Sequence, residues 1–132
     1  LDLALMGRLG LVIDGTGKDY DKIKKQSEKL RTLGYDVSMI FVNTDLDTAI
    51  NRNRKRSRSL PDDKVAQMWQ GVQSNLGRFQ NLFGKFMYIV DNSDGSNWKG
   101  ATMSVYKLIS KWSKGEPKSP IAKEWIKQQR SK

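Results

Sequence analysis

Residues 9–17 read LGLVIDGTG, and they are the first indication of the fold class. It is a short apolar run closed by an aspartate and a glycine-rich turn, which is typical of a strand buried on both faces of a parallel sheet. Apolar residues at helical spacing follow over residues 19–33, and a second apolar run covers residues 37–42. This strand, helix, strand order predicts a parallel sheet covered by helices.

The rest of the chain keeps this alternation. Further helices are expected to begin near Thr44, Leu60, Trp98 and Ser119, with a third strand over residues 86–90. We therefore expect an α/β fold of three layers, in which helices flank a parallel three-stranded sheet. We assign residues 1–114 to this domain, and residues 115–132 to a linker and a basic C-terminal helix.

The amino-acid composition limits which kinds of site and which partners the protein can have. The 132 residues carry 24 Lys and Arg against 14 Asp and Glu, a net charge of +10. This excess favours partners that bear phosphate, although solubility alone would also explain it. There is no Cys and no His, which excludes disulfides, thiolate chemistry, His-ligated zinc and a Ser-His-Asp triad, so no metal site is expected. No apolar run approaches the roughly 20 residues of a membrane span, so we expect a cytoplasmic protein without a membrane partner.

The first candidate site is the turn after the first predicted strand. Ligands of parallel α/β sheets bind beyond the carboxyl ends of the strands, where Asp14 lies. A carboxylate there can hold Mg²⁺ through water or act as a base, and Gly15 would let the backbone approach a ligand. A tight turn with an aspartate cap explains the same residues. The turn is not a Walker A loop, because G-x-x-x-x-G-K-S/T occurs nowhere in the sequence.

The second candidate is the basic stretch at residues 52–58, which holds five cations in seven residues. On a helix Arg52 and Arg56 share a face, as do Arg54 and Arg58. Like charges at that spacing repel, so the stretch costs stability unless anions neutralise it, and the arginine fork matches phosphate oxygens. The alternative is a solvated basic face.

The third candidate is Asn92, in the polar turn after the last predicted strand. At the carboxyl edge of the sheet it could contact a base or a ribose. An ordinary turn accounts for the same residues.

Taken together, the order of these pieces resembles the P-loop kinases of the polynucleotide kinase and zeta toxin group, especially their phage-encoded relatives. The resemblance covers about Gly7 to Asn92. It rests on a strand ending Ile-Asp-Gly-Thr-Gly, on Arg52-Asn53-x-x-Arg56 before Leu60-Pro61, and on the long helix and last strand that follow.

The resemblance implies roles for particular positions. Asp14 and Thr16 would lie near the phosphoryl acceptor, Arg52 and Arg56 would be lid arginines that stabilise the transferred phosphoryl group, and Asn92 would lie near the base. The implied nucleotide-binding set is completed by Gly15, Lys18, Arg54 and Arg58. ATP and Mg²⁺ are the cofactors that the resemblance implies.

One departure from the group decides the expected activity. The glycine-rich loop of these kinases belongs on a strand upstream of Leu1, so neither cofactor is expected to bind tightly to this chain alone. We expect the C-terminal portion of a phosphotransferase, a truncated P-loop fold that is inactive by itself. The alternatives are a basic module that binds nucleic acid or another polyanion, and a scaffold subunit whose open sheet accepts a strand. Expected partners are therefore a phosphate-bearing ligand, nucleic acid, a second copy, or the N-terminal segment.

Overall fold

The computed structural model describes residues 1–132 and contains one sheet of two strands, β1 (Met39–Asn43) and β2 (Met87–Asp91). The strands run parallel, in a register that pairs Phe41 with Ile89. The helices are α1 (Asp2–Met6), α2 (Tyr20–Thr32), α3 (Leu46–Arg54), α4 (Asp62–Phe83), the 3-10 turn η1 (Gly84–Phe86), α5 (Trp98–Lys114) and α6 (Pro120–Arg130). The predicted α/β class is confirmed, as a small open parallel sheet with helices.

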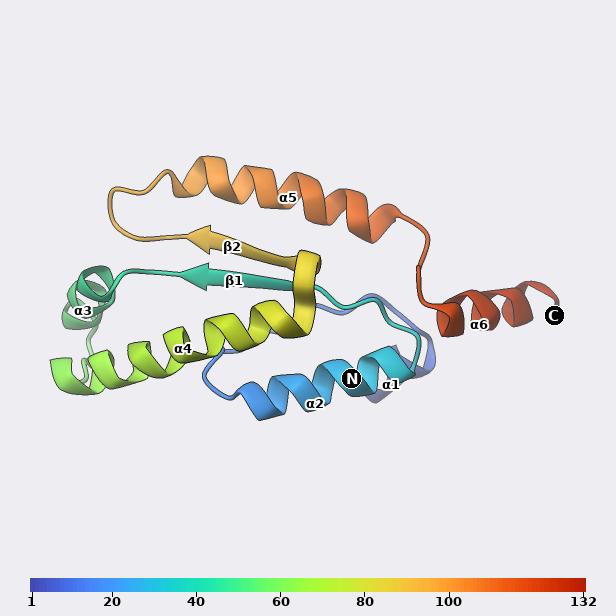
Figure 1. Ribbon diagram of the computed structural model, residues 1–132, viewed down its shortest axis with the longest axis horizontal. Coiled ribbons are helices and arrows are strands. Elements are labelled where there is room, and N and C mark those ends of the chain that lie inside the picture. The colour runs from blue at the N-terminus through green and yellow to red at the C-terminus, as the bar shows by residue number, and fades with distance from the viewer. The chain divides into compact units, whose positions relative to one another are not determined.

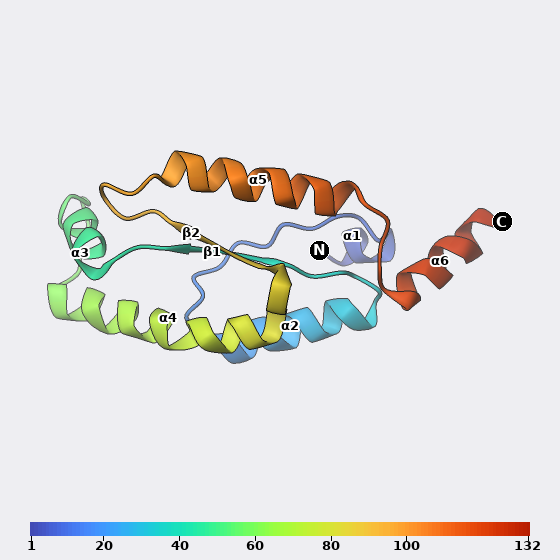
Figure 2. The ribbon, with the colours of Figure 1, turned by 45° about the horizontal axis from the view of Figure 1, so that its top comes forward.

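The chain forms two compact units. The first comprises Leu1–Asp36 with Pro117–Lys132, and the second comprises Val37–Glu116. Within the second unit, α4 and α5 lie on opposite sides of the two strands, and α3 lies beyond the carboxyl ends of the strands (Figures 1 and 2). The second unit therefore has helices on both faces of its sheet. The loops that follow the two strands lie at the carboxyl edge, which these two helices do not cover.

The core of the second unit is aromatic. Phe79 of α4 is completely buried, and its ring lies 6.2 Å from that of Phe41 on β1 and 6.5 Å from that of Phe83. Val90 of β2 is also buried. Tilted aromatic pairs at these distances are favourable beyond the area they bury, so α4 is fixed against one face of the sheet.

Polar contacts set the position of α4 along β1. The indole Nε1 of Trp69 donates to the Thr44 carbonyl at 2.8 Å, and the Gln73 amide donates to the Asn43 side chain at 2.6 Å. These donors lie on the same helix as Phe79, so α4 both covers the sheet and reaches the end of β1.

The first of the three predicted strands, over residues 9–13, is not formed. Residues 9–13 have no regular secondary structure, and the side chain of Val12 is fully exposed. A strand needs a neighbour to pair its N–H and C=O groups, and the sheet contains only β1 and β2. The backbone of Leu9 is satisfied differently, since its N–H donates to Ala4 and its carbonyl accepts from the Tyr35 hydroxyl.

Two helix ends are set by their capping residues. Gly84 ends α4 with a φ of 57°, a positive value that glycine adopts without strain. The cap of α3 differs from the expectation by one residue. Asp45, rather than Thr44, is the N-cap, and its carboxylate accepts from the Thr48 N–H at 2.7 Å.

The first unit packs α6 against the residues that follow α2. Gly34 has a φ of 99°, and a Cβ there would lie 2.9 Å from the Ala122 nitrogen, so only glycine fits. The Asp36 carboxylate accepts from the Lys118 N–H at 2.7 Å. The Arg8 guanidinium lies over the Trp125 ring, 5.8 Å from its centroid. None of the helices is both long enough and apolar enough to cross a bilayer.

Candidate functional site

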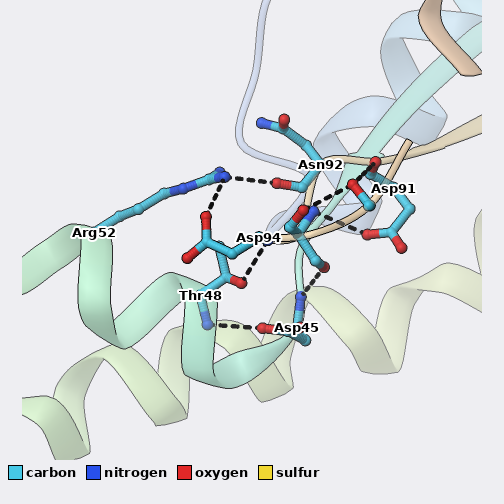
Figure 3. A network of polar contacts seen from close by, with 8 residues as sticks. Asp45, Thr48, Arg52, Asp91, Asn92 and Asp94 are labelled. Atoms are coloured by element: carbon cyan, nitrogen blue, oxygen red, sulfur yellow. Dashed lines mark hydrogen bonds and ion pairs between the residues drawn. The ribbon is translucent and has the colours of Figure 1, made fainter. Parts of the chain in front are cut away.

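The loops that follow β1 and β2 meet at the carboxyl edge of the sheet (Figure 3). The Ser93 hydroxyl accepts from the Asp45 N–H at 2.7 Å, and the Asn92 N–H donates to the Asn43 carbonyl at 2.7 Å. Two segments that are almost fifty residues apart in the sequence are therefore joined directly. This is the edge where parallel α/β sheets bind ligands.

The first turn of α3 is part of the same network. Thr48 is buried, and its hydroxyl accepts from the Asp94 N–H at 3.0 Å. Its own N–H is bound by the Asp45 carboxylate, as described above. Ser93 is buried as well. Because each of these buried polar groups has a partner, the network holds the N-terminus of α3 on the β2–α5 loop.

The two aspartates of the network act as acceptors. Hydrogen bonds from the side chain and backbone of Thr48 hold the pKa of Asp45 below its usual range. Hydrogen bonds from Ser93 likewise lower the pKa of Asp91, whose carboxylate accepts from the Ser93 N–H at 3.0 Å. Both carboxylates are therefore ionised at neutral pH, and their role is to hold the loops.

Arg52 and Asn92, which the sequence analysis placed in two separate candidate sites, contact each other. The guanidinium NH2 of Arg52 donates to the Asn92 backbone carbonyl at 2.8 Å and to the Asp94 carboxylate at 3.2 Å. The Asn92 side-chain amide extends away from α3 (Figure 3). Arg52 therefore contacts the loop through one nitrogen, while the Asn92 amide, which can both donate and accept, is not used by this contact.

The segment between α3 and α4, residues 55–61, is called the basic loop below. It follows Arg54, which forms a two-point ion pair with Asp62 at the start of α4, one contact being Nε to Oδ1 at 3.2 Å. The hydrogen bond from Arg54 and its charge lower the pKa of Asp62. The loop's three cations, Lys55, Arg56 and Arg58, are exposed and form no ion pair.

Asn53 closes the basic loop at its base, a role that sequence reasoning missed. Its side chain is buried, its amide nitrogen donates to the Leu60 carbonyl at 2.7 Å, and its amide oxygen accepts from the Leu60 N–H at 3.1 Å. Thr48 and Ser93 were missed as well. Asn53 stands in the Arg52-Asn53-x-x-Arg56 motif, but the motif does not reveal its bonds to Leu60. Thr48 and Ser93 have no local sequence signal, because their partners lie in other segments of the chain.

The predicted acceptor-side residues belong to the first unit. Asp14, Gly15, Thr16 and Lys18 are exposed, in the segment before α2 that has no regular secondary structure. Their roles stay predictions. Across the chain, no group of three or more His, Cys, Asp or Glu side chains is placed to hold a metal ion.

Comparison with known proteins bears on this arrangement. Neither a curated protein nor a solved structure was found to match the chain. The family model described as Zeta toxin matches residues 1–100, which include both strands, the basic loop and the whole polar network. Because the match spans most of the 132 residues, the chain belongs to the zeta toxin family, a membership that indicates a kinase-like, nucleotide-binding function.

Proposed function

We propose that this chain is the lid-bearing and base-side part of an ATP-dependent phosphotransferase. The observation that carries the proposal is the joint placement of Arg52 and Asn92 at the carboxyl edge of the sheet. Three residues after Arg52 begins the basic loop, whose cations form no ion pair. Family membership supports the kinase class. In this proposal the Asn92 amide contacts the nucleotide base, and the basic loop covers the phosphates.

The side chains present suit a polyphosphate. Lys55, Arg56 and Arg58 are exposed cations without ion-pair partners. Arg52 uses only NH2 in its contacts, so its Nε and NH1 groups still have hydrogens to donate to a phosphate. Arg54 differs, because its Nε and NH2 groups both donate to the Asp62 carboxylate, which also neutralises its charge. We assign phosphate binding to Arg56, Arg58 and Arg52, and assign Arg54 to the shape of the lid.

Phosphoryl transfer also needs a phosphate-binding loop, in addition to the residues at the carboxyl edge of the sheet. The 132 residues contain no G-x-x-x-x-G-K-S/T loop to cradle the β- and γ-phosphates. We propose that a glycine-rich loop on another segment supplies that cradle, that Asp14 and Thr16 face the phosphoryl acceptor, and that this chain alone binds ATP weakly and turns over little or none. Bound together, ATP and Mg²⁺ would supply the transferable phosphoryl group and neutralise its charge.

A titration of the chain with ATP tests the proposal. Arg56→Ala should weaken binding by about tenfold to a hundredfold, since a charge-assisted contact is worth roughly 1.5–3 kcal/mol. Lys107→Ala on α5 is the control, because it removes the same charge from an exposed position outside the loop. Equal affinity in all three proteins would refute the assignment. ATP turnover by this chain alone, abolished by Arg56→Ala, would show a kinase that needs no other segment.

The net charge of +10 and the exposed cations also favour nucleic acid as a ligand. Such binding would weaken steeply with salt, because each phosphate contact releases counterions. Titration with short DNA and RNA at several salt concentrations separates the two functions. Affinity for nucleic acid that exceeds the affinity for ATP, with a steep salt slope, would place this chain with the polyanion-binding modules.

The open sheet favours a third function, a scaffold that accepts a strand from a partner or from a second copy. β1 pairs only with β2, and its Ile40 and Val42 side chains are exposed. An unpaired edge next to exposed apolar side chains is a template for another strand. Light scattering decides this point for self-association: a monomer at all concentrations excludes pairing between copies.

A further inference from the structure

The basic loop is closed at its base by one side chain. Asn53, next to the last residue of α3, is only 6% exposed. Its amide nitrogen and oxygen bond the carbonyl and N–H of the same residue, Leu60. This two-point bracket copies the way a neighbouring backbone strand would pair Leu60, and it ties the two ends of the loop together.

A second closure lies directly beside the first. Arg54, the last residue of α3, meets Asp62, the first residue of α4, through two contacts. Both of these side chains are about half exposed, so solvent and salt weaken their attraction. Asn53 is buried instead, and its loss would leave the N–H and C=O of Leu60 without their partner. The Asn53 bracket is therefore the stronger of the two closures.

The Asn53–Leu60 and Arg54–Asp62 contacts determine which cations of this segment are available to a ligand. Arg54 is consumed by the second closure, whereas Lys55, Arg56 and Arg58 lie inside the closed loop with no ion-pair partner. An ordered loop that holds like charges close together loses conformational entropy, and its charges repel one another, before any ligand binds. A site that has already met these costs binds an anion more tightly than a loose loop.

We propose that Asn53 is a positioning residue that orders the basic loop, so that Arg56 and its neighbouring cations meet a polyphosphate together. The role rests on the proposed function, because it concerns the same ligand. Asn53 itself does not touch the ligand. Its contribution is the loop shape.

The test compares four forms of the chain: wild type, Asn53→Ala, Asn51→Ala and Arg56→Ala. Asn51 is the matched control, since it is the same residue type on the same helix but is exposed. Trypsin cleavage after Lys55, Arg56 and Arg58 reports the order of the loop without any ligand. Titration with inorganic tripolyphosphate at several salt concentrations reports how many cations meet the anion.

For Asn53→Ala we expect loop cleavage to accelerate about tenfold over the wild type, the change that corresponds to about 1.4 kcal/mol of lost ordering. Tripolyphosphate affinity should fall by a similar factor, with a shallower salt slope resembling that of Arg56→Ala. Asn51→Ala should match the wild type. Asn53→Asp keeps the size and the acceptor for the Leu60 N–H, so its cleavage rate should be intermediate, and it serves as the test if Asn53→Ala fails to fold.

The outcomes separate this inference from the proposed function. Suppose that the wild type binds tripolyphosphate and that Asn53→Ala has the same cleavage rate, affinity and salt slope. This result overturns the role of Asn53 and leaves the proposed function standing. An unchanged salt slope with a lower folded fraction shows a residue that only stabilises the fold, and also overturns it. If the wild type binds neither tripolyphosphate nor ATP, the proposed function fails, and trypsin alone decides whether Asn53 orders the loop.

Discussion

Residues 9–13 and β1 share a pattern but have different structures. Each is a short apolar run that leads into a turn containing an aspartate, and each was predicted to be a strand. β1 pairs with β2 along its length and buries Phe41, whereas residues 9–13 form no strand and leave Val12 exposed. An apolar run is therefore only a candidate for a strand, and a strand forms where a neighbouring segment offers free N–H and C=O groups for pairing.

The largest effect should come from the β1 side of this comparison. Phe79→Ala removes the ring that packs against Phe41 and is completely buried. We expect it to destabilise the chain by about 3–5 kcal/mol, because a cavity replaces the ring. Urea unfolding followed by tryptophan fluorescence measures the loss. A cost under about 1 kcal/mol would mean that α4 is not held by the core described here.

A second test concerns the unit that contains residues 9–13. Gly34→Ala forces an alanine into a left-handed backbone and places its Cβ 2.9 Å from the Ala122 nitrogen, so we expect a loss of about 2 kcal/mol or more. Gly15→Ala is the matched control, since nothing lies within 4 Å of its added Cβ. Its effect should stay within about 0.5 kcal/mol on the same unfolding curves. Equal effects of the two changes would show that α6 does not pack on Gly34.

Acid should act on the turn after β1 through Asp45. Its pKa is lowered in the folded chain, mainly by the Thr48 hydrogen bonds. The ionised carboxylate therefore stabilises the fold above the ordinary aspartate pKa of about 3.9, and this contribution is lost as the pH falls through the folded pKa. Asparagine caps helices as well as aspartate does. Asp45→Asn should change stability little at pH 7 and flatten its fall in acid, as urea unfolding at several pH values will show. An unchanged acid profile would contradict this account.

The smallest expected effect returns to the exposed run. Val12→Ala should change the free energy of unfolding by less than about 0.5 kcal/mol, because that side chain is fully exposed. Val90→Ala is its matched partner on β2, where the same deletion from a buried position should cost about 2 kcal/mol. Similar costs at the two positions would show that residues 9–13 pack as a strand in solution.

Much of the fold was predictable from local pattern. The long helix follows from apolar spacing between Pro61 and Gly84, and both observed strands follow from apolar runs displaced by one or two residues. The site was predictable only in part. Arg52 and Asn92 were both named from the sequence, but their contact was not predicted. The pairing of Arg54 with Asp62 and the hydrogen bonds between Asn53 and Leu60 were not predicted either.

The amino-acid pattern was enough to predict the α/β class, both strands that form, the charge, the absence of Cys and His chemistry, and the resemblance to zeta toxin kinases that the family match confirms. These features can be predicted because they depend on the composition, or on residues that are close together in the sequence. Which apolar runs form strands, and which arginines have no ion-pair partner, became known only from the folded chain. Those outcomes depend on hydrogen-bond and charge partners from other segments, such as Ser93 for Asp45 and Asp94 for Arg52, which only folding brings within reach.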